Sequence, residues 1–388
     1  MLVTPVGRYS LAMRRGLFGL AFASVLKAKA ALWDDSTWSL AGQTGAITGY
    51  DSNLFTVNNG PGDAFATLRA SLGLSRKDTE YSFETEAWFD WTSFLRETGD
   101  DSFDPGVRMN LLYPANVDAQ PTQAMEVHWI RTTAANLDVG QRITQEDALA
   151  KYEGNLVDTG KSVIAGRVSF DRDEYLGVEF DTINTAAFGT TFSYLPNDLY
   201  RAGLGYDLTL GQSVPNAPGT ADLDQTEHAF TFRLSGEFTP KLTGKISVGA
   251  AYSEYSGSFY HYEWDAVAGI DLVWKPRERL SISAEVARGP TFNPDGDVDL
   301  ATSATLEVEQ ELGRGFAIHA QLMGGRTDHE RTTTFRIDRF WGTGAGVRYN
   351  FSGKLIASVD YDWTRQDSDV LRYTYRRQVV SGKVAYNF

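Results

Sequence analysis

The sequence predicts an all-β protein, a transmembrane antiparallel up-and-down β-barrel of about 18 strands, with about 16 as the alternative count. Three observations lead to this prediction. Apolar and polar residues alternate with a period of two along most of the chain after Ala31. The connections between these segments are alternately short turns and longer polar links. The chain ends on an aromatic residue, Phe388, which also ends an alternating segment.

The composition excludes several other classes of protein. The 388 residues include no cysteine, 37 glycines and 12 prolines, and 13% of them are aromatic. A chain without cysteine has no disulfide framework and no thiolate metal site. Beyond residue 30, no apolar run approaches the roughly 20 residues of a membrane-spanning helix. This composition is typical of a chain with many strands and not of a disordered acidic chain.

The first 30 residues have the order of a secretory signal peptide. Arg14 and Arg15 precede an apolar run over 16–26, and Ala28-Lys29-Ala30 offers small residues for cleavage. We therefore predict a signal peptide over 1–30 and a single barrel domain over 31–388. A short buried helix is the alternative for the leader, and Lys27 leaves the cleavage position open.

The charge of the chain bears on its partners. The formal net charge is −14, and the leader contributes basic residues only. A strongly acidic exported protein is a poor ligand for nucleic acid, so we predict no nucleic-acid partner.

The segment 264–274 shows the alternation most clearly. Its apolar face begins and ends with tryptophan, at Trp264 and Trp274, whereas Asp265, Gly269 and Asp271 lie on the other face. Ten residues span roughly 33 Å along a strand, or about 23 Å across a membrane at a tilt near 45°. The spacing therefore fits the two aromatic girdles that border the apolar band of an outer-membrane barrel.

The same pattern recurs over 204–210, 230–238, 304–309 and 355–363. A water-soluble sandwich would also alternate, but its apolar faces meet each other and need no aromatic rings at both ends. Charges on the second face favour a closed barrel around a hydrated or salt-bridged lumen.

The connections support the same topology. Short turns are expected at 75–78, 239–241, 275–278, 313–315 and 352–354, and longer links at 97–105, 135–145, 211–225, 290–298 and 327–333. Short periplasmic turns opposite longer external loops are typical of outer-membrane barrels. Roughly 19 segments can be counted, and we expect about 18 because bacterial barrels have an even number. Strands are least clearly marked between 114 and 198.

The end of the chain carries a targeting signal. Val384, Tyr386 and Phe388 alternate up to the last residue. This pattern resembles the last-strand signature that the barrel assembly machinery recognises. It implies that machinery as a partner and the cell outer membrane as the location, where outer-membrane lipid and lipopolysaccharide would surround the barrel.

A search for catalytic chemistry finds no constellation. The five histidines include no H-E-x-x-H pair, no nucleophile lies beside a plausible base, and no P-loop is present. The acidic stretch 293–297 lacks the ligand pattern of an EF-hand. We predict no enzymatic activity, no cofactor and no metal; a barrel hydrolase is the least favoured alternative.

Charged residues on the predicted inward faces are the candidate functional residues. They are Arg69, Glu84, Glu86, Arg108, Arg167, Arg201, Asp207, Arg233, Glu237, Asp271, Glu307, Glu309, Asp360 and Asp362. One interpretation is a self-neutralising network that stiffens the wall. The other is a hydrophilic pore, because a barrel of this size leaves an aqueous lumen unless a segment plugs it.

Several short motifs point to a family. The stretches Tyr50-Asp51-Ser52-Asn53-Leu54-Phe55, Leu137-Asp138-Val139-Gly140 and Trp274-Lys275-Pro276 resemble those of bacterial outer-membrane β-barrels that are often encoded with exopolysaccharide export or exosortase-type systems. The resemblance implies an outer-membrane location and a role beside polysaccharide export. It supplies no catalytic residue.

We therefore predict a non-enzymatic outer-membrane barrel, a channel or envelope component with a polar lumen. The alternative is a partner of an exopolysaccharide export system, with polysaccharide as its ligand. In that case the aromatic residues Tyr255, Phe259, Tyr260 and Tyr262 could stack on sugar rings; anchoring at the membrane interface is the other explanation for them.

Overall fold

The structure is a computed structural model that describes residues 33–34, 37–78, 80–114, 123–136, 140–177, 180–197, 199–216, 223–256, 261–293, 298–329 and 336–388. The predicted signal peptide lies outside these residues. Within them, no helix is long and apolar enough to cross a membrane.

Strands account for almost all of the regular structure. Their bounds are β1 Trp33–Asp34, β2 Trp38–Asp51, β3 Asp63–Lys77, β4 Ser82–Phe94, β5 Ser102–Tyr113, β6 Gln123–Asn136, β7 Gln141–Asp158, β8 Ser162–Leu176, β9 Asp181–Tyr194, β10 Tyr200–Pro215, β11 Leu223–Thr239, β12 Leu242–Ser256, β13 His261–Arg277, β14 Leu280–Phe292, β15 Val298–Gly313, β16 Phe316–His329, β17 Arg336–Asn350, β18 Leu355–Ser368 and β19 Tyr375–Asn387. Two single-turn 3-10 helices, η2 (Thr98–Asp100) and η3 (Leu371–Tyr373), lie in the connections.

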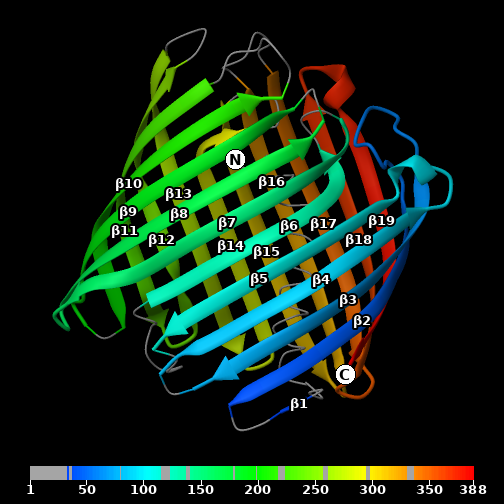
Figure 1. Ribbon diagram of the computed structural model, residues 1–388, viewed down its shortest axis with the longest axis horizontal. Coiled ribbons are helices and arrows are strands. Elements are labelled where there is room, and N and C mark those ends of the chain that lie inside the picture. The colour runs from blue at the N-terminus through cyan, green and yellow to red at the C-terminus, as the bar shows by residue number, and fades with distance from the viewer. Residues whose placement is uncertain are drawn as a thin grey trace.

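The strands from β2 to β19 form a closed barrel of 18 strands. Each pairs antiparallel with its neighbours in the chain, and β19 pairs back to β2 from Val379↔Asp51 to Asn387↔Gln43. Figure 1 shows the first and last of these strands side by side. The two-residue β1 only adds a short pairing to β2. The predicted fold class and strand number are confirmed.

The seam between β19 and β2 depends on the last residue. The backbone N–H of Phe388 donates to the carbonyl of Gly42 at 2.9 Å, and the N–H of Gly42 donates back to the carbonyl of Phe388 at 2.8 Å. The ring of Phe388 lies over Gly42, where a Cβ atom would be 2.9 Å from its Cζ. Glycine at this position therefore makes room for the terminal aromatic ring.

The two ends of the barrel differ in their connections. The chain terminus lies at the end with the tight turns at 240–241, 278–279 and 314–315, which we call periplasmic. The link 52–62 lies at the other, extracellular end, where β10 also ends at Pro215.

Several expected links have other bounds in the structure. The link expected at 135–145 is only 137–140, because β6 continues to Asn136 and β7 begins at Gln141; likewise β10 continues to Pro215. Backbone hydrogen bonds, and not apolar side chains, hold an antiparallel pair together, so polar strand ends remain paired. At the periplasmic end, β5 ends at Tyr113 and β6 begins only at Gln123, within the range 114–198 in which the sequence marks strands least clearly.

Candidate functional site: the lumen and its charged wall

The wall of the barrel has an oily outer face. On β3, Leu68 and Leu72 are each 49% exposed, whereas the Arg69 side chain between them is 11% exposed and faces inward. On β13, Trp264 and Trp274 lie exposed on the outer face near its two ends. An apolar outer surface on a closed antiparallel barrel, with aromatic residues towards both ends, places the protein in the outer membrane.

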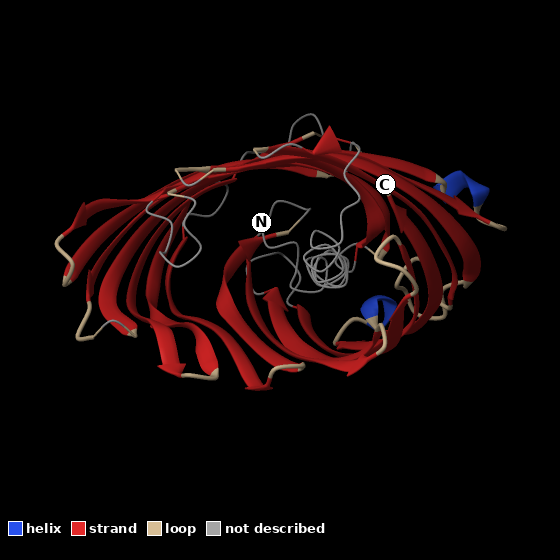
Figure 2. Ribbon diagram, turned by 90° about the horizontal axis from the view of Figure 1, so that it is seen from below, coloured by secondary structure: helices blue, strands red, loops and turns tan. Residues whose placement is uncertain are grey.

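The lumen contains a cavity of about 540 Å³. Residues of β2–β4, β6, β7 and β13–β19 line it, so it occupies one part of the barrel rather than its whole circumference. Figure 2 shows the strands as a continuous ring that is wider than it is deep. Four of the predicted lumen residues line the cavity: Glu307, Glu309, Asp360 and Asp362.

Glycines make room for the charged groups of the cavity wall. Asp360 Oδ1 is 3.2 Å from His319 Nε2 on β16. A Cβ atom on Gly346 would collide with both of these side chains, and one on Gly344 would be 2.6 Å from Asp362 Oδ1. The carboxylates thus lie across β17 against its bare backbone, instead of projecting into the lumen.

A second group surrounds Asp207 on β10, whose side chain is 8% exposed. Arg167 Nη2 lies 2.9 Å from its Oδ1 in an ion pair, and Arg233 donates to Oδ2. Arg233 Nη1 also donates to Thr191 Oγ1 at 2.6 Å. Gly205 leaves the space that the Arg233 guanidinium fills. Two arginines of the predicted set thus hold one carboxylate and cross-link β8, β10 and β11.

Two further predicted arginines have acidic neighbours. Arg69 Nε is 3.7 Å from Asp90 Oδ1, and its guanidinium lies 5.8 Å from the centroid of the Trp88 ring. Arg108 Nε is 3.8 Å from Glu126 Oε1.

The other predicted residues of β4, β10 and β11 are Glu84, Glu86, Arg201 and Glu237. Glu86 lies opposite Arg108 in the β4–β5 register. Glu84, Arg201 and Glu237 lie near the periplasmic ends of their strands, away from the cavity.

Three acids form a patch that makes no ion pair within 4.0 Å among the described residues, although Lys245 on β12 lies opposite Asp271 in the register. Asp271 on β13 lies directly opposite Glu285 on β14, and Glu307 on β15 lies opposite Ser283, two residues from Glu285. Across the described ranges, no lysine, arginine or histidine nitrogen lies within 4.0 Å of these three carboxylates. Gln321 Nε2 donates to Glu307 Oε1 at 3.0 Å, which leaves the charge in place. We call Asp271, Glu285 and Glu307 the acidic patch.

The link 52–62 reaches over the cavity, which the sequence did not reveal. Leu54 is 1% exposed and lines the cavity. The N–H of Asn58 donates to the carbonyl of Arg372 at 3.2 Å, beside η3. On the other side, Val57 lies so close to Gly140 that a Cβ atom there would be 2.8 Å from Val57 Cγ1. The link therefore bridges the β18–β19 and β6–β7 connections at the extracellular mouth.

Asp51 anchors this link at its start. Its side chain is 4% exposed, and Arg377 Nε on β19 donates to Oδ1 at 3.0 Å and to Oδ2 at 2.9 Å. The N–H of Asn53 donates to the same Oδ1 at 3.0 Å. The motif Tyr50-Asp51-Ser52-Asn53-Leu54-Phe55 is thus built around an ion pair between residues 326 positions apart.

An apolar cluster joins walls of the barrel that are not neighbours in the sheet. It consists of Ile143, Tyr175, Phe180, Ile183, Tyr255, Phe292 and Val298, from β7–β9, β12, β14 and β15. Phe292 on β14 fills the space beside Gly211 on β10. These side chains occupy the inside of the barrel near its extracellular end, so the lumen is narrowed there.

The cluster also corrects one hypothesis. Tyr255 was a candidate for an aromatic rim that stacks on sugars, but it is 4% exposed within this cluster and lies beyond the reach of such a ligand. Tyr262 is 63% exposed, whereas Phe259 and Tyr260 lie outside the described residues.

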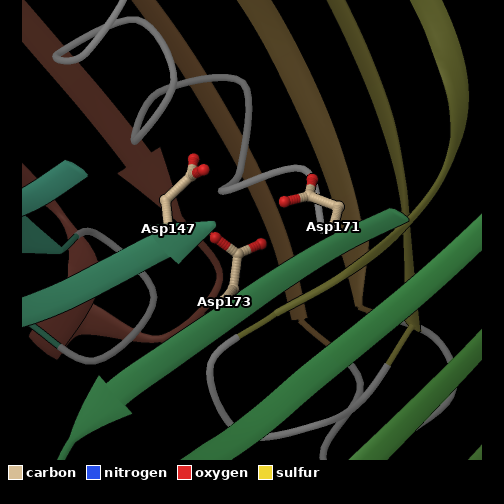
Figure 3. A group of neighbouring side chains, drawn as sticks. All are labelled: Asp147, Asp171 and Asp173. Carbon is tan, nitrogen blue, oxygen red and sulfur yellow. The ribbon is translucent and has the colours of Figure 1, made fainter. Parts of the chain in front are cut away.

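A group of three acids on β7 and β8 has protein donors. The carboxylates of Asp147, Asp171 and Asp173 offer oxygens within 4.8 Å of one another (Figure 3). His128 Nε2 is 2.7 Å from Asp147 Oδ1, and Gln145 Nε2 donates to Asp173. We therefore interpret these acids as part of the hydrogen-bonded wall and assign no ion to them.

No protein-family model and no curated protein matches the sequence. Three solved structures are similar. OpdL from Pseudomonas aeruginosa has 12% identity, with 90% of this chain and 98% of that chain covered and a TM-score of 0.47. OccAB4 from Acinetobacter baumannii has 8% identity, with 91% of this chain and 99% of that chain covered and a TM-score of 0.47. The FrpB iron transporter from Neisseria meningitidis (F3-3 variant) has 9% identity, with 86% of this chain and 62% of that chain covered and a TM-score of 0.46. The chain thus spans less than two thirds of the length of FrpB.

Proposed function

We propose that the protein is a passive, non-enzymatic outer-membrane channel for small polar solutes, and that it passes cations more readily than anions. The observation that carries this proposal is the acidic patch: Asp271, Glu285 and Glu307 on three adjacent strands, with no cation within 4.0 Å among the described residues. The adjoining cavity, which Glu307 lines together with Glu309, Asp360 and Asp362, provides space inside the barrel.

The physical reason is the difference between balanced and unbalanced charge. The ion pair between Glu309 and Arg348, at 2.7 Å, largely cancels its own field. The acidic patch is not cancelled in this way, and the low-dielectric wall behind it focuses its field into the lumen. Rings or patches of carboxylates are the usual basis of cation preference in pores.

The test is single-channel recording in planar bilayers under a potassium chloride gradient. We expect a stable conductance and a reversal potential that favours potassium. The triple variant Asp271→Asn/Glu285→Gln/Glu307→Gln should lower the cation-to-anion permeability ratio by roughly fivefold, because a patch in hydrated surroundings contributes about 1 kcal/mol. Glu237→Gln, near the periplasmic end of β11, is the matched control and should leave the ratio unchanged.

Two results would contradict the proposal in different ways. Folded protein that gives no conductance would remove the channel itself. A conducting triple variant with an unchanged reversal potential would leave the channel and remove the role of the acidic patch.

A further inference from the structure

Four arginines gather on the outer face at the extracellular ends of adjacent strands. Arg326 lies on β16, Arg339 on β17, Arg365 on β18 and Arg376 on β19. Each is an even number of residues from an exposed apolar side chain of the outer face, for example Leu322 on β16 at 58% and Val380 on β19 at 49%. The four therefore point away from the lumen, and we call them the arginine patch.

The arrangement places like charges side by side. Arg326 lies directly opposite Arg339, and Arg365 directly opposite Arg376. Like charges directly opposite each other destabilise an antiparallel pair. The barrel thus carries two unfavourable pairs on neighbouring strands, although its overall charge is strongly negative.

Acidic neighbours neutralise only half of the patch. Arg326 Nε is 2.6 Å from Asp328 Oδ1, and Arg365 Nη2 is 2.9 Å from Asp367 Oδ1. Arg339 and Arg376 are exposed. Asp367 lies directly opposite Arg339 in the register, but no carboxylate oxygen of the described residues lies within 4.0 Å of either guanidinium. On the same outer face, Arg172 Nη2 on β8 is 2.8 Å from Glu174 Oε2, whereas Arg288 on β14 donates to the carbonyl of Ala266 and to Thr302 Oγ1.

The depth of the patch in the membrane indicates its surroundings. The Arg365 guanidinium lies 5.2 Å from the centroid of the Trp341 ring, which is 40% exposed on the outer face. Tryptophans of this kind mark the boundary between the apolar band and the headgroups. The arginines lie at or beyond this boundary on the extracellular side, and exposed apolar residues such as Val359 and Val384 continue below it.

From these observations we infer that the arginine patch binds the phosphate groups of a phosphorylated glycolipid of the outer leaflet, whose acyl chains lie along the apolar wall of β16–β19. Guanidinium groups donate in a planar fork that matches phosphate oxygens. A phosphate between opposed arginines would turn the repulsion within each pair into shared attraction. The adjoining apolar wall fits a lipid rather than free phosphate.

The experiment measures binding of bisphosphorylated lipid A to the purified full chain in neutral detergent, by native mass spectrometry and by the rise in unfolding temperature. The double variant Arg339→Gln/Arg376→Gln should bind about tenfold or more weakly, since it removes the two guanidinium groups that lack protein partners. Arg172→Gln, which removes an outward arginine from a balanced pair, is the matched control and should bind like the unchanged protein. Dephosphorylated lipid A should bind the unchanged protein as weakly as the double variant binds the phosphorylated lipid.

The double variant is expected to fold, because it removes like-charge repulsion; its stability without lipid should be equal to or above that of the unchanged protein. Equal binding of phosphorylated and dephosphorylated lipid would overturn the inference, as would a double variant that binds like the control. Inorganic phosphate that competes at the same concentration as lipid A would show a simple anion site and remove the role of the lipid.

Discussion

Asp51→Asn should release the link that reaches over the cavity. The substitution keeps the shape of the side chain and one oxygen that can accept from the N–H of Asn53, but removes the charge that Arg377 Nε contacts at 3.0 and 2.9 Å. Breaking a fully buried ion pair costs about 3 to 5 kcal/mol. Because the Arg377 side chain is 26% exposed and can be hydrated, we expect a loss of about 2 to 3 kcal/mol in the free energy of unfolding.

Urea unfolding in detergent, followed by tryptophan fluorescence, measures this loss. Arg172→Gln is the comparison, because it breaks an ion pair whose side chains are 50% and 39% exposed and should cost less than about 1 kcal/mol. The link 52–62 should also move more, so the single-channel current of Asp51→Asn should fluctuate more than that of the control. If Asp51→Asn costs no more than Arg172→Gln and its current is as quiet, Asp51 does not anchor the link.

Three further substitutions test other parts of the barrel. Gly346→Ala forces Asp360 and His319 to shift and should lower the free energy of unfolding by about 1 to 3 kcal/mol. Gly73→Ala is the control, because its Cβ would meet no atom closer than 3.6 Å, and equal urea midpoints for the two variants would contradict the prediction. Phe292→Ala removes a buried ring from the apolar cluster and should lower the free energy of unfolding by about 3 to 5 kcal/mol. The variant should also admit larger neutral polymers in conductance-blocking measurements, and an unchanged size limit would show that the cluster does not narrow the path. Phe388→Ala should reduce the fraction of protein that appears folded in outer membranes, because the ring packs over Gly42 at the closing seam; Phe351→Ala, which is 58% exposed, is its control, and equal folded fractions would argue against an assembly role.

The period of two was sufficient to predict the wall of the barrel. It determines which residues of a strand share a face, so Trp264 and Trp274 could be placed on one side and Asp271 on the other. Hairpin pairing extends this to neighbours: once the turn at 278–279 is known, Asp271 and Glu285 must lie near each other. These relations are local in sequence, which is why one chain is enough to infer them.

Contacts across the lumen could not be predicted in this way. The same holds at the closing seam: the pair Asp51–Arg377 lies between the adjacent strands β2 and β19, but its residues are 326 positions apart and no hairpin register relates them. The apolar cluster did leave a signal, since Tyr175, Ile183 and Tyr255 interrupt an otherwise polar inward face near the extracellular ends of their strands. Apolar residues on that face are costly to leave in water, so several of them at one depth indicate walls that meet.

Different residues restrict the size and the charge of the solutes that this lumen can pass. The apolar cluster and the link 52–62 limit the width of the path near the extracellular end, and neither depends on the charge of the acidic patch. The acidic patch acts through its field, and its residues contribute nothing to the buried cluster. The size limit and the ion preference should therefore vary independently. Phe292→Ala should raise the size of the largest solute that passes, with little change in reversal potential. The acidic-patch variant should change the reversal potential and leave the size limit unchanged. If each substitution changed both the size limit and the reversal potential, the narrowest point of the path and the strongest field would lie at the same depth. That would contradict the positions of these residues along their strands.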